Sequence, residues 1–307
     1  MIYVEKIHLP SEDDNQINVV ETYHKSFYPF HVLSSRGLYE VEFSDITLIT
    51  GGNGTGKSTL LNVIAQKLNL HRQTPFNRTV HFDMYLRRCS IEYSDISMQL
   101  PYDIREYGRI ITSDEVFDYM LDLRIKNEKI DEKRRIMLEE INRANNTKYQ
   151  DGPRNIDFED QGSVETYTKF VEMKQTSTSH YIKNHLGFNI LEQSNGENAF
   201  KYFTDAMKPQ GLYLLDEPEN SLSAERQIAL AEYIESVARF EQCQFIISTH
   251  SPFLMSIRGA KLYNLDVFPA AVMPWSEVSE VKVYHDFFKK RDSEFNNQPD
   301  LTRPIQH

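Results

Sequence analysis

Short apolar runs of strand length alternate along the chain with longer stretches of helical period. The runs at residues 46–49, 211–215 and 244–247 are almost continuously apolar, which is typical of strands buried on both faces of a sheet. Apolar residues at helical spacing follow the first run, at Leu60, Leu61, Val63, Ile64 and Leu68. A similar stripe follows the second run, at Ala224, Ile228, Ala231, Ile234 and Val237. These patterns predict an α/β fold built on buried parallel strands.

The N-terminal part of the chain is rich in β signals. Residues 2–4 begin a strand, and the segments 30–33 and 38–43 bracket a turn-like cluster at 34–37. We expect an antiparallel hairpin there, leading into the strand at 46–49. The chain is therefore expected to begin with an antiparallel β region.

The middle of the chain has helical character. Ser113 or Asp114 can cap a helix over residues 114–146, which has an imperfect apolar stripe and charges of both signs. We interpret those charges as a solvated helical face rather than as a nucleic-acid contact. Further predictions are weak strands at 79–84 and 89–94, a loop at 147–165 and a helix over about 164–186.

Composition narrows the class of protein. The chain has 307 residues, of which 40% are hydrophobic and 26% charged, a balance typical of soluble globular proteins. A net charge of −11 argues against a surface uniformly coated for nucleic acid, although a local basic patch stays compatible with it. Cys89 and Cys243 lack metal-ligand spacing. Without a signal peptide or a run of about 20 apolar residues, we expect a cytoplasmic protein that does not insert directly into a membrane.

Residues 51–58 read Gly-Gly-Asn-Gly-Thr-Gly-Lys-Ser, which fits the phosphate-binding pattern G-x-x-x-x-G-K-[ST]. A predicted strand precedes the motif and a predicted helix follows it, as the motif requires. Glycines allow the backbone to wrap phosphate oxygens, and the helix N-terminus adds positive potential. Lys57 would reach the β- and γ-phosphates, and the Ser58 hydroxyl would bind Mg²⁺. The predicted nucleotide-binding residues are Gly51, Asn53, Gly54, Thr55, Gly56, Lys57, Ser58 and Thr59.

Acidic residues end the second buried run, and a histidine follows the third. The run at 211–215 leads into Asp216 and Glu217, at the strand end where ligands sit in open α/β sheets. Asp216 is predicted to hold Mg²⁺ together with Ser58. Glu217 is predicted to polarise the water that attacks the γ-phosphate. His250 is predicted to hydrogen-bond that phosphate or the attacking water.

Between these motifs lies the stretch Gln193-Ser194-Asn195-Gly196-Glu197. Its residues can form a helix N-terminus that offers a hydroxyl and N–H groups to an anion. This signal is weak alone and gains weight from its position between the phosphate loop and the acidic strand.

The order of these motifs resembles the ATP-binding-cassette (ABC) ATPases, and within them the soluble branch of RecF, SMC and Rad50 proteins and their small stand-alone relatives, the AAA-family predicted ATPases. The resemblance implies a Walker A loop at 51–58, a Walker B aspartate at Asp216, a catalytic Glu217 and a switch His250. It also implies a signature motif with Ser194, Gly196 and Glu197, a D-loop at 220–223, and a closing strand and helix within 262–288.

The implied fold is an α/β P-loop NTPase, an ABC ATPase head with a mixed central sheet, an N-terminal antiparallel β subdomain and a helical insert. We expect one such domain in four parts: residues 1–113, 114–190, 191–290 and a polar tail at 291–307. The insert stands where the larger relatives extend coiled coils, but it is too short and irregular for one.

The implied mechanism uses ATP and Mg²⁺. Two monomers would bury two ATP molecules head to tail, with Ser194 of one monomer closing over the γ-phosphate held by the other. Hydrolysis would reopen this homodimer. The expected function is a Mg²⁺-dependent ATPase switch that controls a nuclease or toxin effector of a defence or repair system, docked on the insert, or that acts on nucleic acid.

Two other classes of protein remain as alternatives. An ATP-binding subunit of a membrane transporter is disfavoured by the insert and by Ser-Asn-Gly-Glu in place of Ser-Gly-Gly-Gln. The glutamine of the Q-loop is not identifiable either, with Gln99 the only candidate. A nucleotide-dependent scaffold with negligible turnover is disfavoured by Glu217 and His250. Tyr23, Phe27 and Phe30 are open candidates for packing on adenine.

Overall fold

The computed structural model describes residues 1–11, 27–95, 107–146, 161–186 and 195–296. The chain divides into two compact units, which we treat separately. The first comprises Met1–Phe117 and Asn195–His307, and the second comprises Asp118–Ser194. The second unit covers most of the predicted insert.

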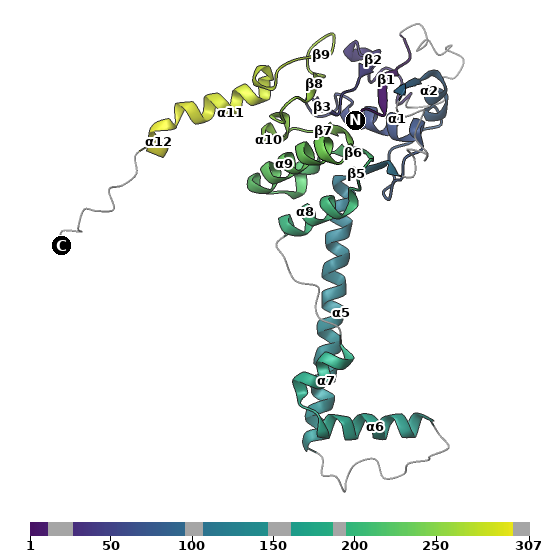
Figure 1. The fold of residues 1–307 in the computed structure, drawn as a ribbon, viewed down its shortest axis with the longest axis vertical. Helices are drawn as coiled ribbons and strands as arrows, with labels where there is room; N and C mark the ends of the chain where they lie inside the picture. Colours follow the sequence, from purple (N-terminus) through teal and green to yellow (C-terminus); the bar gives the residue numbers. More distant parts are fainter. Residues whose placement is uncertain (12–26, 96–106, 147–160, 187–194, 297–307) are drawn as a thin grey trace, which may run out of the picture. The chain divides into compact units, whose positions relative to one another are not determined.

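A six-stranded sheet is the centre of the first unit (Figure 1). Its strands, in spatial order, are β5 (Arg109–Thr112), β6 (Leu212–Asp216), β7 (Gln244–Ser248), β3 (Ile46–Thr50), β8 (Lys261–Asn264) and β9 (Ala271–Val272). The first five are parallel, and β9 runs antiparallel to β8. Every residue of β3 and β7 is buried, as expected for strands covered on both faces. The predicted mixed central sheet is confirmed.

A second, antiparallel sheet is formed by the N-terminal region. It has the order β2 (Glu40–Glu42), β1 (Val4–His8) and β4 (Ser90–Tyr93). The side chain of Gln244 at the start of β7 joins this sheet to the central one, because it accepts from the backbone N–H of Tyr3 at 2.9 Å and donates to the Val4 carbonyl at 2.8 Å. The predicted antiparallel β subdomain is confirmed, and so is the strand at 89–94.

Two local predictions in this region are wrong. Residues 30–33 form turns that lead into the 3₁₀ helix η1 (Ser34–Arg36), so no hairpin forms and β2 pairs with β1. Phe30 and Leu33 are both buried, and a spacing of three fits a turn better than an alternating strand. The predicted strand at 79–84 gives way to the helix α2 (Phe82–Arg88), in which Phe82 and Tyr85 are buried at the same spacing.

Helices of two crossovers pack against the central sheet. Between β3 and β5, α1 (Lys57–Leu68) packs against β5, β6 and β7. Between β6 and β7, the chain forms η3 (Pro218–Ser221) and α9 (Ala224–Phe240), and the latter packs on β7 and on α8 (Asn195–Ala206). After β7 come α10 (Pro252–Met255), η4 (Trp275–Glu277), α11 (Ser279–Lys290) and α12 (Asp292–Asn296).

The second unit is helical. The long helix α5 (Ser113–Asn146) enters it, followed by α6 (Gln161–Gln175) and α7 (Thr178–His185). The predicted helix at 164–186 is thus two helices, because the Ser177 side chain caps a new start by accepting from the backbone N–H of His180. A small core unites them, formed by Ile141, Ala144, Met173 and Tyr181. Among the described residues, no helix is long and apolar enough to cross a membrane.

Candidate functional site

The phosphate loop connects β3 to α1 and contacts the end of β8. Gly56 has φ +103° and lies so close to Val32 that an added Cβ would stand 2.8 Å from that side chain. Glycine is therefore required where the loop turns into α1. The Thr55 hydroxyl donates to the Gly52 carbonyl at 2.9 Å, and the Gly52 N–H donates to an Asp266 carboxylate oxygen at 2.9 Å.

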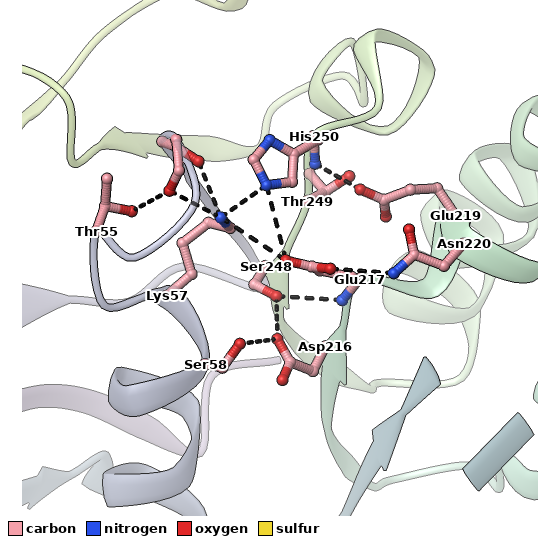
Figure 2. A network of polar contacts seen from close by, with 12 residues as sticks. Thr55, Lys57, Ser58, Asp216, Glu217, Glu219, Asn220, Ser248, Thr249 and His250 are labelled. Atoms are coloured by element: carbon pink, nitrogen blue, oxygen red, sulfur yellow. Dashed lines mark hydrogen bonds and ion pairs between the residues drawn. The ribbon is translucent and has the colours of Figure 1, made fainter. Parts of the chain in front are cut away.

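Lys57 is the buried charge of this loop, with a side chain only 4% exposed. Its Nζ donates to the carbonyls of Gly51 at 2.9 Å and Gly52 at 3.3 Å, and to Nε2 of His250 at 2.7 Å (Figure 2). A Glu217 carboxylate oxygen lies 3.7 Å from the same nitrogen. The ammonium group is thus satisfied by neutral acceptors that an anionic oxygen could replace.

Asp216, at the end of β6, contacts Ser58 in the first turn of α1. Its Oδ1 accepts from the Ser58 hydroxyl at 3.0 Å and from the Ser248 hydroxyl at 2.5 Å (Figure 2). Burial raises the pKa of Asp216, and the two hydroxyl donors partly counteract this. A hydroxyl and a carboxylate oxygen about 3 Å apart fit neighbouring ligands of an octahedral Mg²⁺, whose metal–oxygen distance is about 2.1 Å. These residues therefore suit Mg²⁺, with its other ligands supplied by water and phosphate.

Glu217 adopts a left-handed backbone conformation, with φ +49° and ψ +54°, which is uncommon for a residue other than glycine. Its N–H donates to the carbonyl oxygen of Ser248 at 3.0 Å, and the Asn220 side chain donates to its Oε2 at 3.0 Å. Its Oε1 lies 3.7 Å from both Lys57 Nζ and His250 Nε2. The conformation therefore turns the carboxylate toward the phosphate loop.

His250 is held from two sides. Its backbone N–H donates to Oε1 of Glu219 at 2.5 Å, and its Nδ1 lies 3.4 Å from Oε2 of Glu280 on α11. Burial raises the pKa of Glu219. Among the described residues, the second oxygen of that carboxyl is buried without a hydrogen-bond partner.

Most predicted site residues converge at the carboxyl ends of the strands β3, β6 and β7. A pocket of about 320 Å³ is lined by Tyr28, Val32, Asn53, Gly54, Gly56, Lys57, Ser58, Thr59 and Glu217. Gly51 and His250 border it through their bonds to Lys57, and Asp216 through its bond to Ser58. Thr55 is buried and folds back on the loop. The predicted roles of all these residues stay predictions.

Two of the three predicted signature residues, Gly196 and Glu197, lie elsewhere in the first unit. Gly196 is on α8 beside Ser223 and Arg226, and Glu197 pairs with Arg226 at 3.0 Å. Neither is among the residues that line the phosphate-loop pocket. Ser194, Gln99 and Tyr23 lie outside the described residues.

Three residues of the site were not predicted from the sequence. Ser248 was detectable, because it stands opposite Asp216 in the parallel register of β6 and β7. Tyr28 lines the pocket and donates to the Thr59 hydroxyl at 3.2 Å, whereas the candidate Phe30 is buried in the core. Glu280 carries no local signal, because only the path of the chain brings α11 next to His250.

The chain is similar to solved structures of an SMC head domain and of an ATP-binding cassette. One similar structure is an SMC head domain with an extended coiled coil, bound to the C-terminal domain of ScpA, from Pyrococcus furiosus. It is 15% identical, with 95% of this chain and 100% of that chain covered and a TM-score of 0.44. Another is a nucleotide-free ATP-binding cassette from an ABC transporter, 18% identical, with 80% and 87% covered and a TM-score of 0.36. No curated protein matches the chain.

A family model matches residues 90–256, more than half of the chain. The match includes Asp216, Glu217 and His250 and begins after the phosphate loop. The parallel sheet, the glycine-rich loop opening α1 and the acidic end of β6 form a P-loop NTPase fold. The chain belongs to the family described as "AAA domain, putative AbiEii toxin, Type IV TA system".

Proposed function

We propose that this protein binds ATP with Mg²⁺ and hydrolyses it at the phosphate loop. The observation that carries the proposal is that Lys57 Nζ, Glu217 Oε1 and His250 Nε2, which follow three different strands, lie within 3.7 Å of one another. Asp216 accepts from Ser58, the residue next to Lys57, at 3.0 Å. Carboxyl ends of parallel strands are where open α/β sheets bind their ligands.

Binding rests on the loop and its lysine. The Lys57 ammonium exchanges the carbonyls of Gly51 and Gly52 for β- and γ-phosphate oxygens, which are stronger acceptors because they are charged. The N–H groups at the start of α1 add donors to the same oxygens. Ser58 and Asp216 would hold Mg²⁺, which would supply positive charge to the phosphates. Tyr28 and Val32 offer an apolar wall for the base.

Hydrolysis rests on Glu217 and His250. Asn220 holds one Glu217 oxygen and leaves the other to accept a proton from the attacking water. A positioned general base contributes about 10²- to 10⁴-fold in rate. His250 Nε2, 3.7 Å from that oxygen, contacts the same water or the γ-phosphate.

The active form is a homodimer that contains ATP. Gly196 and Glu197 stand at the start of α8, beside α9 and not in the pocket of their own chain. A second copy can bring this helix start to the exposed side of the pocket, with Ser194 closing on the phosphates.

The ATP-bound dimer acts as a switch on a partner effector of the toxin or nuclease type, in defence or repair. The family description, which links this AAA domain to a putative toxin and a type IV toxin–antitoxin system, supports a role in a system of that kind. The partner docks on the second unit. There, Leu121, Ile125 and Ile136 lie on one face of α5 and are exposed by 36%, 46% and 47%, and apolar side chains grouped on a surface favour protein contacts.

Phosphate release from ATP tests the proposal. The wild-type protein should release phosphate with ATP and Mg²⁺ and stop when Mg²⁺ is chelated. Glu217→Gln should lower the turnover rate at least about 100-fold because the base is lost. Glu225→Gln, an exposed carboxylate in the first turn of α9, is the matched control and should keep wild-type turnover. Wild-type protein without turnover, or equal turnover in Glu217→Gln, would refute hydrolysis at this site.

A further inference from the structure

The imidazole of His250 lies between the phosphate-loop cluster and the helix α11. On one side, Nε2 contacts Lys57 Nζ at 2.7 Å and faces Glu217 Oε1 at 3.7 Å (Figure 2). On the other side, Nδ1 is 3.4 Å from Oε2 of Glu280. Glu280 belongs to none of the motifs of a P-loop nucleotide site.

The partners of the ring determine which nitrogen carries the proton. An ammonium group has donors and no acceptor, so the Nε2 that faces Lys57 must accept. A neutral imidazole then has its proton on Nδ1, which donates to the Glu280 carboxylate. The contacts with Lys57 and with Glu280 therefore imply the same tautomer, in which the Nε2 lone pair is directed toward the pocket.

Glu280 is in a position suited to this task. It lies in the first turn of α11, where the helix N-terminus stabilises a negative charge. Val278 and Val281 flank it and are only 1% and 7% exposed, so this turn is anchored in the first unit. Farther along α11, Tyr284 and Phe287 are about half exposed. The first turn is therefore the part of the helix that can hold His250 in place.

We propose that Glu280 is a positioning residue for His250, one that keeps Nε2 directed at the nucleotide during turnover. This inference rests on the proposed ATP hydrolysis. When Lys57 turns to the phosphates, it leaves Nε2, and Glu280 becomes the contact that maintains the ring orientation. Glu219 fixes the backbone N–H of His250 at the same time, so the residue is held at both ends.

Kinetics with three variants test the role. Glu280→Ala should lower kcat for phosphate release about tenfold, the lower end of the roughly 10- to 100-fold loss seen for carboxylates that orient metal-binding histidines, with KM for ATP changed by less than about twofold. Glu280→Gln keeps an oxygen acceptor for Nδ1–H and should recover kcat to within about threefold. Asp286→Ala, which removes an exposed carboxylate from the same helix, is the matched control and should behave as wild type.

A double-mutant cycle separates positioning from a general structural effect. In a His250→Ala background, Glu280→Ala should have no further effect on kcat. An unchanged tenfold loss in that background would overturn the proposal, as would a loss in Glu280→Gln equal to that in Glu280→Ala.

A magnetic resonance measurement keeps the inference independent of activity. With ¹⁵N-labelled histidine and no nucleotide, the His250 Nδ1–H signal should be protected from exchange in the wild type and unprotected in Glu280→Ala. His250→Asn identifies the signal among the ten histidines. If the wild type releases no phosphate, the proposed hydrolysis fails, while this signal still tests the contact. A signal that is equal in both proteins refutes the role of Glu280.

Discussion

Lys57, which is buried, and Asp216, which is half-buried, are the two charged groups on which the site depends. Lys57 is satisfied by backbone carbonyls and a histidine nitrogen, and Asp216 by two hydroxyl groups. Within the part of the chain that the structure describes, the ion pair between Lys57 and Glu217 is long, at 3.7 Å, and neither Lys57 nor Asp216 makes a shorter one that would have to be broken before a ligand enters. The cost of keeping these charges out of water is therefore offset by weak acceptors and donors that a phosphate and a cation can replace.

Replacing Lys57 tests the binding role. Lys57→Ala removes the one side-chain ammonium among the residues that line the described pocket, so ATP affinity should fall about 100-fold or more, as for loss of a charge-assisted contact worth roughly 3 kcal/mol. Calorimetric titration with ATP and Mg²⁺ measures it. Lys67→Ala, at the last turn of the same helix, is the control and should bind normally. Unchanged affinity in Lys57→Ala would remove the phosphate loop from the proposal.

We expect the ionisation of Asp216 to make the stability of the folded protein depend on pH. Its folded-state pKa is raised above 3.8 by burial, so the folded protein binds this proton more tightly than the unfolded chain. The resulting stabilisation is present below about pH 3.8 and is lost as the pH rises through the raised pKa. Asparagine resembles the protonated acid and can still accept from both hydroxyls.

Asp216→Asn should therefore raise the melting temperature by a few degrees at pH 7 without nucleotide, while abolishing the Mg²⁺-dependent turnover. The difference from the wild type should shrink as the pH approaches 4. Scanning calorimetry across this range measures both. A variant that is less stable than the wild type at pH 7 would contradict the argument.

At the scale of elements, the backbone geometry of the phosphate loop places different demands on its glycines. Gly54 and Gly56 both have positive φ, at +78° and +103°. An added Cβ on Gly54 would meet nothing within 4 Å, whereas one on Gly56 would meet Val32 and Leu33 at 2.8 and 3.0 Å. Gly56 is a fixed position of the sequence motif whereas Gly54 falls on a variable one, and the fold distinguishes them in the same way.

Alanine substitutions should separate these two glycines. Gly54→Ala carries only the left-handed backbone penalty, about 1–2 kcal/mol of unfolding free energy. Gly56→Ala adds a clash and should cost about 3 kcal/mol or more. Urea unfolding of nucleotide-free protein measures both free energies. Equal losses would mean that α1 can shift away from Val32 without cost.

At the scale of the whole molecule, the proposed switch is an association equilibrium. A ligand that binds only the dimer drives association by its binding free energy. Glu217→Gln leaves Lys57, Ser58 and Asp216 intact, so ATP should bind and stay. The variant should then accumulate as an ATP-containing dimer.

Light scattering measures this dimer directly. Glu217→Gln should double its mass only with ATP and Mg²⁺, and the double variant Lys57→Ala, Glu217→Gln should stay monomeric. A DNA duplex added to the dimer separates two readings of the function. Co-migration favours action on nucleic acid, and indifference favours a protein effector at the second unit. A Glu217→Gln protein that stays monomeric with ATP would contradict the proposed sandwich.

Much of the fold was predictable from local pattern. The strands β3, β6 and β7 were predictable because strands buried on both faces are continuously apolar, and α1 and α9 because one apolar face recurs at helical spacing. The failures at residues 30–33 and 79–84 share one cause. A few apolar residues in a short segment fit a turn, a short helix or a strand equally well, and packing against the core decides between them.

The sequence by itself determined the chemical groups of the site and their order along the chain. Lys57, Asp216, Glu217 and His250 are each marked by a motif or by their place after a buried run, and parallel strands bring such places to one edge. Only the tertiary structure decided which partners complete them. Ser248, Tyr28 and Glu280 reach the site through strand register and the path of distant segments, which no local pattern encodes. The physical reason is that motifs record short-range backbone requirements, whereas the contacts that orient a side chain are long-range.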